Sequence, residues 1–520
     1  MKNELDTSKQ LMINMIASLV SCIVSLGISF FLTPYIQETI GYEAVGFVKL
    51  ATDFVSYATI ASTALNSMAS RFITIKIHQK DMKTANEYFN SVLFANLGIV
   101  GFLMVPAVFL VLHLEKVISI SPSLVFDVKI LFAAMFINFM ITVVGTTFSV
   151  ATFAANRLDL SSRRTIEANL IRALLIIVLF TFLPVKISYV GVTTLIATLY
   201  MIISNAYYTK LLFPQILFGR RFFSLLRVLE ILKSGIWNTI MRTGQILNNG
   251  LDLLITNVLI NEYSMGLLGT AQTIAAAINT LYETIAGVFS PSLTIHYAKG
   301  DKESLVSELK TSMRLTGFFA NIPLGFVIGF GLPFYNLWLR SSSAPDRFMI
   351  YQLTVVIMGG IIVGGAISPL FNVFTIVNKL KYNSLVVLIQ GIVKTLLLLI
   401  ILDTTNLGIW AVASLSSIIG VLKNLTFTPM YAAHCLHISK KTFYPTILRY
   451  IFVSTFMVAI FVGMGHILPA SNWMWILIDI ILCGIVGSMI NITLLFEQRE
   501  KQILLDTLSR KNKNRTDHRN

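Results

Sequence analysis

The sequence predicts an all-α polytopic membrane protein with fourteen transmembrane helices: two pseudo-symmetric six-helix lobes followed by two further helices. Three observations support this fold class. Of the 520 residues, 55% are hydrophobic and 12% charged, and the mean hydropathy is +0.76. Long apolar segments alternate with short charged or turn-rich loops, and the first half of the chain is repeated in the second. Such a composition excludes a soluble enzyme, and the short loops leave no room for a soluble catalytic domain.

Each predicted span is long enough to cross the hydrocarbon core of a bilayer, which takes about 20 helical residues. In chain order the spans are centred in residues 11–33, 44–69, 88–112, 125–153, 165–183, 187–209, 235–260, 264–290, 311–338, 349–377, 383–402, 407–433, 446–468 and 473–496.

Lysine and arginine indicate the orientation of these spans. With the N-terminus inside, the cytoplasmic loops, tails and adjoining span edges carry 30 of the 40 basic residues. The outward loops carry five, namely Lys116, Lys129, Lys186, Arg340 and Arg347. The positive-inside rule therefore predicts a protein of the cytoplasmic (inner) membrane with both termini in the cytoplasm. Topology also explains the net charge of +15, so no nucleic-acid partner is expected.

An internal repeat relates the two halves. A shift of 220 residues lays residues 42–52 on 262–272, with Gly46 on Gly266, and lays 71–81 on 291–301. A shift of 224 lays the first span on the seventh. We therefore expect two parallel six-helix halves related by an axis along the membrane normal, which is a known transporter plan.

The repeat and the charge pattern divide the chain into five parts. They are a first lobe at 1–212, an amphipathic cytoplasmic linker at 213–233, a second lobe at 234–436, two added spans at 437–497 and a basic cytoplasmic tail at 498–520. The linker alternates basic with aromatic and leucine residues, as in a helix lying at the membrane interface.

The seventh span has the most polar face in the chain. Polar residues recur on it at intervals of three or four, at Asn238, Arg242, Gln245, Asn249, Asp252 and Thr256. On a helix they fall within an arc of about 80°. A charge at the bilayer centre costs at least ~2.5–3.5 kcal/mol, so this face must turn toward protein or water. A water-filled pathway is the favoured interpretation, and a packed seam between helices is the alternative.

These polar groups supply the candidate site. The expected substrate-binding residues are Arg242, Asn238, Gln245, Asn249, Asn14, Ser18 and Lys49. The expected coupling-ion residues are Glu283, Asp252 and Asp53, because carboxyl groups inside a membrane can take up and release cations. Lys49 and Asp53 lie one helical turn apart, so a satisfied ion pair between them remains an alternative to a cavity role.

Other polar groups inside the spans have less definite roles. Lys394 and Lys423 have no acid nearby in sequence and could face an anionic substrate or the cytoplasmic rim. The sequence assigns no role to Asp479. His434 and His437 flank Cys435, but no carboxylate accompanies them, so no metal site and no cofactor are expected.

Four segments of the sequence carry a resemblance to a known family, namely residues 64–81, 261–273, 289–301 and 334–339. On these segments the chain resembles the multidrug/oligosaccharidyl-lipid/polysaccharide (MOP) exporter superfamily and, within it, the bacterial polysaccharide flippases. The resemblance implies a fold like that of MATE transporters, with two lobes around a central cavity. It also implies alternating-access transport of a polyprenyl-diphosphate-linked oligosaccharide, with cavity cations facing the diphosphate. The implied partners are this lipid-linked substrate, membrane lipids and the polysaccharide polymerase machinery.

Two differences between the first span of this chain and the first helices of superfamily members limit which substrates are expected. Flippases of the lipid-linked peptidoglycan precursor carry arginines in their first helices, whereas residues 11–33 here contain no charge, which argues against that precursor as the substrate. Multidrug exporters of the superfamily commonly hold an acidic residue in the first helix, and this chain has no acid there.

A cation-coupled multidrug exporter is therefore the alternative function, ranked after the flippase. A membrane glycan polymerase or acyltransferase is a third, and it is disfavoured because the histidines lie at span edges, in loops or in the tail. No enzymatic activity is expected.

Overall fold

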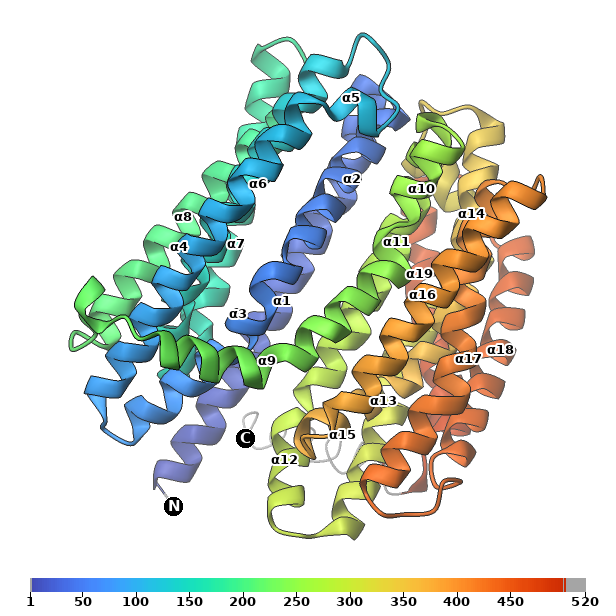
Figure 1. Cartoon of the computed structure of the whole chain (residues 1–520). Coiled ribbons are helices and arrows are strands. Elements are labelled where there is room, and N and C mark those ends of the chain that lie inside the picture. The colour runs from blue at the N-terminus through green and yellow to red at the C-terminus, as the bar shows by residue number, and fades with distance from the viewer. Residues whose placement is uncertain (1, 499, 502–520) are drawn as a thin grey trace, which may run out of the picture. The chain divides into compact units, whose positions relative to one another are not determined.

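The computed structural model describes the backbone of residues 2–498, 500 and 501. Side chains are described from residue 13 onward within that range, except those of residues 15, 18, 19, 291, 295 and 298. Nearly all of the predicted basic tail, 498–520, lies outside these residues. Every regular element of the described part is a helix (Figure 1), which confirms the all-α fold class.

The elements follow one another in this order: α1 (Lys2–Ile40), α2 (Tyr42–Ala58), α3 (Ile60–His78), α4 (Met82–Leu112), α5 (Leu114–Val117), α6 (Val125–Ala154), α7 (Leu158–Phe182), α8 (Ser188–Leu212), η1 (Arg220–Phe222), α9 (Leu225–Gln245), η2 (Ile246–Gly250), α10 (Asp252–Leu259), α11 (Glu262–Val288), α12 (Ser290–Ala298), α13 (Lys302–Trp338), α14 (Ala344–Ile367), α15 (Leu370–Ile376), α16 (Leu380–Thr404), α17 (Ile409–Cys435), α18 (Tyr444–Ile467), α19 (Trp473–Ile490) and η3 (Asn491–Leu495).

Within the described residues, 11 helices are long and apolar enough to cross a membrane, or up to 12 if the bent pair α2 and α3 forms one span. That pair is bent by 67° at Thr59. The polytopic prediction is thus confirmed, while the count of fourteen stays a prediction. The seventh expected span is not among the 11, because it is broken into α9, η2 and α10 and has a polar face.

The helices pack into two compact units. Unit 1 contains Met1–Thr273 and Leu380–Val412, and unit 2 contains Ile274–Lys379 and Ala413–Asn520. The boundaries fall inside α11 and α17 as well as before α16. Packing therefore groups α9, α10 and α16 with the N-terminal helices. The division into repeat-related lobes and a linker stays a prediction from the sequence.

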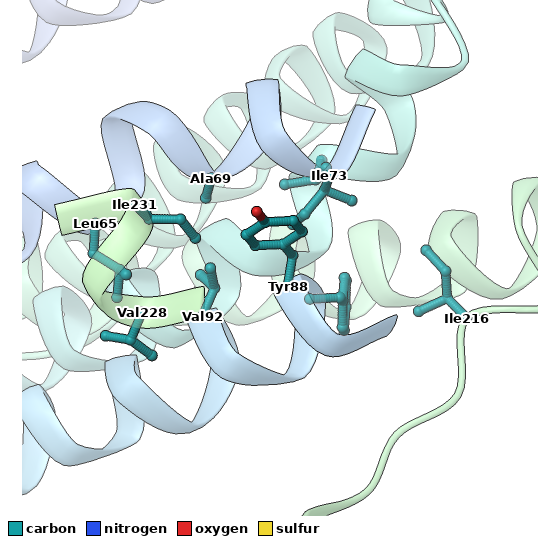
Figure 2. Packing of buried hydrophobic residues seen from close by; sticks show 10 residues of the cluster. Leu65, Ala69, Ile73, Tyr88, Val92, Ile216, Val228 and Ile231 are labelled. Carbon is teal, nitrogen blue, oxygen red and sulfur yellow. The ribbon is translucent and has the colours of Figure 1, made fainter. Parts of the chain in front are cut away.

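In unit 1, α6 and α8 run side by side (Figure 1), and the end of α9 near the linker shares a core with α3 and α4. Figure 2 shows Leu65 and Ala69 of α3 packed beside Val228 and Ile231 of α9. Burial of these side chains fixes the start of α9 on the N-terminal helices.

Buried polar groups on α4 hold the chain before α9. The Oδ1 of Asn86 accepts the Leu217 amide over 2.8 Å, and the Oδ1 of Asn90 accepts the Gly219 amide over 2.9 Å. The Nδ2 of Asn90 donates to the carbonyl of Leu217 over 2.8 Å. These bonds satisfy the backbone of a segment without regular structure. Within the linker predicted at 213–233, only the part from Leu225 onward forms the α-helix that the amphipathic pattern predicts.

Repeat-related glycines lie against each other where α2 meets the first turns of α11. A Cβ on Gly46 would lie 3.1 Å from the Cα of Gly266. A Cβ on Gly266 would lie 2.5 Å from the Tyr42 carbonyl oxygen. The rings of Tyr42 and Tyr263 meet edge to face at 5.8 Å.

Substituting Gly266 with alanine should therefore lower the stability of unit 1. The added methyl group meets backbone atoms of Tyr42 that cannot rotate away, and such overpacking typically costs about 1–3 kcal/mol. Thermal unfolding in detergent measures the loss. Gly98→Ala on α4 is the matched control, since a Cβ there meets nothing within 4 Å. Equal stability of the two variants would mean that α2 and α11 do not approach this closely.

Unit 2 is organised around α13, which packs on α14, α18 and α19. Arg314 of α13 is only 4% exposed and donates to Glu497 over 2.8 Å and to Glu500. Burial raises the pKa of the Glu500 carboxyl, but hydrogen bonds from Arg314 and Thr311 outweigh it and hold that pKa below its ordinary value. These contacts fasten the chain after η3 to α13.

Candidate functional site

The polar stripe of the seventh predicted span lies on an interrupted helix in unit 1. In η2 the backbone makes a wider π-turn, in which the Leu251 amide donates to the Ile246 carbonyl over 3.2 Å. The Tyr57 hydroxyl of α2 donates to the carbonyl of Gly250. Such π-turns change the phase of the following side chains and frequently occur at functional sites. The stripe is therefore split between α9 on one side and η2 with α10 on the other.

Arg242 occupies the last turn of α9 and is half-buried. Its Nε donates to the Oγ1 of Thr59 over 3.3 Å, at the bend between α2 and α3. This hydrogen-bond partner is neutral, so the contact orients the guanidinium without cancelling its charge. A planar guanidinium held in this way can offer further N–H groups to a second acceptor.

Acids and bases from four helices gather around this point. The Asp53 carboxyl of α2 interacts electrostatically with Lys49, Asp252 and Arg242. Lys49 itself donates to the Gly269 carbonyl at the start of α11. Asp252, the first residue of α10, forms an ion pair with Lys394 of α16. We call Lys49, Asp53, Arg242, Asp252 and Lys394 the charged cluster; it holds three bases and two acids and so has one positive charge in excess.

The pair between Asp252 and Lys394 is the most buried part of the charged cluster. The side chain of Lys394 is 0% exposed and that of Asp252 is 6% exposed. No acid lies near Lys394 in the sequence, and its partner in the structure is 142 residues away. Both side chains are removed from water, so the opposite charge of the partner is what stabilises the charged form of each. The signal that could have found the pair is the lone base of the apolar eleventh span, which could have been matched with an acid on the polar stripe of the seventh.

The neutral members of the stripe differ in exposure. Gln245 and Asn249 are exposed beside the charged cluster, whereas Asn238 is half-buried and donates to the Ser67 hydroxyl over 3.1 Å. Thr256 is buried and donates to the backbone carbonyl of Asp252 over 2.7 Å. The exposed amides can thus offer hydrogen bonds to a ligand, and the buried end of the stripe is a packed seam.

Three further predicted site residues, Asn14, Ser18 and Glu283, are not members of the charged cluster. Asn14 is 5% exposed; its Nδ2 donates to the Asn156 carbonyl over 3.1 Å, and its Oδ1 accepts the Asp159 amide over 3.0 Å. These are the contacts of a residue that fixes the start of α7. The side chain of Ser18 lies outside the described residues. Glu283 is exposed on the part of α11 that belongs to unit 2.

The remaining intramembrane polar groups have defined surroundings. In the part of the chain that the structure describes, no group of three or more His, Cys, Asp or Glu side chains could hold a metal ion. Lys423 lies over the ring of Phe371, 5.2 Å from its centroid, as in a cation–π contact. Asp479 of α19 is 1% exposed, and neither carboxyl oxygen has a hydrogen-bond partner.

The many apolar helices of the described residues define a multi-pass membrane protein, and unit 1 carries a charged, partly exposed cluster. Residues 11–295 match the family described as "Polysaccharide biosynthesis protein", and the chain belongs to that family. This confirms the resemblance to the polysaccharide branch of the MOP exporter superfamily. The protein is accordingly a multi-pass membrane protein of this polysaccharide-biosynthesis family.

Similar proteins agree with this assignment. The chain is 26% identical over 493 residues to the uncharacterized membrane protein EpsK of Bacillus subtilis (strain 168), covering 95% of this chain and 97% of that protein. Its fold is similar to that of a lipid II flippase, MurJ, in an inward closed conformation, with a TM-score of 0.67, 15% identity and coverage of 92% and 98%. An inward-facing multidrug resistance MATE family transporter gives a TM-score of 0.63 at 12% identity, covering 82% of this chain and 99% of that one.

Proposed function

We propose that the protein translocates a polyprenyl-diphosphate-linked oligosaccharide from the cytoplasmic to the outer leaflet by alternating access. The observation that supports this most directly is the excess positive charge of the charged cluster inside the membrane-spanning part of unit 1. A diphosphate cannot enter hydrocarbon without counter-charges, because burying an unpaired anion is very costly. A cluster with more bases than acids lowers this cost along the path.

Each member of the site has a chemical role in this proposal. Arg242, held by Thr59, offers its remaining N–H groups to two phosphate oxygens, and Lys49 adds a second cation. Gln245 and Asn249 are exposed next to Arg242 and hydrogen-bond sugar hydroxyls or phosphate oxygens. Both termini lie in the cytoplasm. The product is a lipid-linked glycan on the outer face, where polysaccharide polymerase machinery would consume it.

Translocation in proteoliposomes tests the proposal. The purified protein is reconstituted with a polyprenyl-diphosphate-linked oligosaccharide bearing a fluorescent sugar, and a glycosidase outside reports the fraction that reaches the outer leaflet. We expect protein-dependent exposure of the labelled glycan and no accumulation of a lipophilic cationic dye, which the excess positive charge repels. Dye transport without glycan translocation would replace the proposal with the multidrug-exporter alternative.

A proton or sodium gradient drives the cycle in this proposal, through Glu283, Asp252 or Asp53. Glu283 is the only one of the three outside unit 1, and Asp252 is already paired with Lys394. Glu283→Gln should therefore make glycan translocation insensitive to an imposed gradient while leaving the basal rate in place. An unchanged gradient response in Glu283→Gln that is lost in Asp53→Asn would assign the coupling to Asp53 and refute the role of Glu283.

A further inference from the structure

In the part of the chain that the structure describes, Arg172 of α7 is a cation without a counter-ion. It is half-buried, and its Nε is enclosed without a hydrogen-bond partner. Within the described residues, no hydrogen bond or ion pair reaches its guanidinium. At 1.5 Å per residue it lies about 10 Å inside the predicted span, which begins at residue 165, and about 15 Å from the Phe182 end of the helix. An uncompensated charge at such depth is expensive and therefore suggests a function.

The internal repeat shows that Arg172 lacks an acidic partner that the corresponding base of the second half has. A shift of 222 lays Arg172 of α7 on Lys394 of α16. The earlier shift of 224 lays Ile28 of α1 on Asp252 of α10. The second half thus contains a base and an acid, and the first half keeps the base but has isoleucine in place of the acid.

The packing of the helices supports the same correspondence. On α1 and α7, Asn169 donates to the Ser25 hydroxyl over 2.6 Å, and these residues are 144 positions apart. On α10 and α16, the paired Asp252 and Lys394 are 142 positions apart. The two helix pairs therefore share nearly the same register. In that register Ile28 is the residue of α1 level with Arg172.

We infer that Arg172 is a second anion site of the transporter, which binds a phosphate group of the lipid-linked substrate during its passage. This inference rests on the proposed function and deepens it. The guanidinium supplies the charge and planar N–H geometry that phosphate oxygens accept. The missing acid leaves those N–H groups free for the ligand. The repeat mate Lys394 has its charge neutralised by Asp252 and cannot act in the same way.

Two sources could supply the phosphate that Arg172 binds, namely the diphosphate of the transported lipid and the head group of a phospholipid. The first turns of α7 carry Asp159, Arg163 and Arg164 and precede the predicted span, which begins at residue 165. Arg172 therefore lies about 10 Å along the helix from the cytoplasmic end of that span. Competition between the two lipids separates these sources.

The decisive variant is Ile28→Asp, which places a carboxylate level with Arg172 and recreates the pair of the second half. Ile28→Asn is the matched control of equal size without charge. The probe is a polyprenyl diphosphate without glycan, titrated against the full-length protein in nanodiscs, with phosphatidylglycerol as competitor. We expect Ile28→Asp and Arg172→Gln each to weaken probe binding about tenfold or more, and Ile28→Asn and Arg172→Lys to retain most of it.

Each other outcome overturns part of this inference. Wild-type affinity in a folded Ile28→Asp or Arg172→Gln variant would remove Arg172 from the anion site. Equal competition by phosphatidylglycerol would assign the site to phospholipid instead of the transported lipid. If the wild-type protein translocates labelled glycan and Arg172→Gln does so equally, the site fails and the proposed function stands. If no glycan is translocated but probe binding still depends on Arg172, the proposed function fails and the anion site stands.

Discussion

Replacing Lys394 with methionine should destabilise unit 1 by about 3–5 kcal/mol. Methionine matches the length of the lysine stem but removes the ammonium group that pairs with Asp252. The carboxylate of Asp252, 6% exposed, is then left without its counter-ion in a place that water does not reach. It must become protonated or draw water into the helix packing, and both cost free energy. Thermal unfolding of the detergent-solubilised protein, followed by tryptophan fluorescence, measures the loss.

The double variant Asp252→Leu with Lys394→Met is the control. Removing both ions leaves an apolar contact of similar volume, which is commonly neutral or even stabilising. A double-mutant cycle should therefore give a coupling free energy comparable to the loss in the single variant. If the single and double variants unfold at the same temperature, the pair does not form in the folded protein. Gradient-driven transport by a stable double variant would also remove Asp252 from the coupling residues.

The fold class could be predicted from the sequence because burial in a bilayer leaves a strong signal. Long apolar segments and the distribution of lysine and arginine depend on the membrane itself. The helix breaks left no such signal. The bend at Thr59 contains neither proline nor glycine, and the π-turn of η2 adds one residue to a turn without changing the apolar character of the segment. The predicted span 44–69 therefore conceals two helical pieces, and the predicted span 235–260 conceals three.

The candidate site was predictable in part for a related reason. The stripe on the seventh span is local, so its periodicity placed Arg242, Gln245 and Asn249 on one predicted helix face, which the π-turn of η2 divides in the structure. The partner of Asp252 was not local, and no spacing rule links residues 142 positions apart. The transfer of the stripe to the first span gave Asn14 a substrate role, whereas its amide holds the turn before α7. The repeat therefore matched the first helix to the seventh predicted span, but the polar side chains of the two helices have different contacts.

Substituting Arg242 with alanine should weaken substrate binding about ten- to a hundredfold. One charge-assisted contact to a phosphate oxygen is worth ~1.5–3 kcal/mol. The protein should still fold, because the substitution removes only one hydrogen bond to the Thr59 hydroxyl, which can find another partner at the bend between α2 and α3. Arg242→Lys should recover part of the affinity, since a lysine ammonium supplies charge without the planar fork of the guanidinium. The measurement is glycan translocation per folded transporter in proteoliposomes, over a range of substrate concentrations.

Thr243→Ala is the matched control for Arg242, because it truncates the next residue of the same helix, whose hydroxyl donates only to the backbone carbonyl of Thr239. This variant should keep wild-type translocation and wild-type yield. If Arg242 instead belongs to a packed seam between helices, Arg242→Ala should lower the yield of folded protein and leave the rate per molecule unchanged. That result would make the α9 face structural and would leave the diphosphate without its principal ligand in the charged cluster. A reduced rate per molecule at normal yield, partly restored by lysine, would identify Arg242 as the residue that binds the anionic substrate.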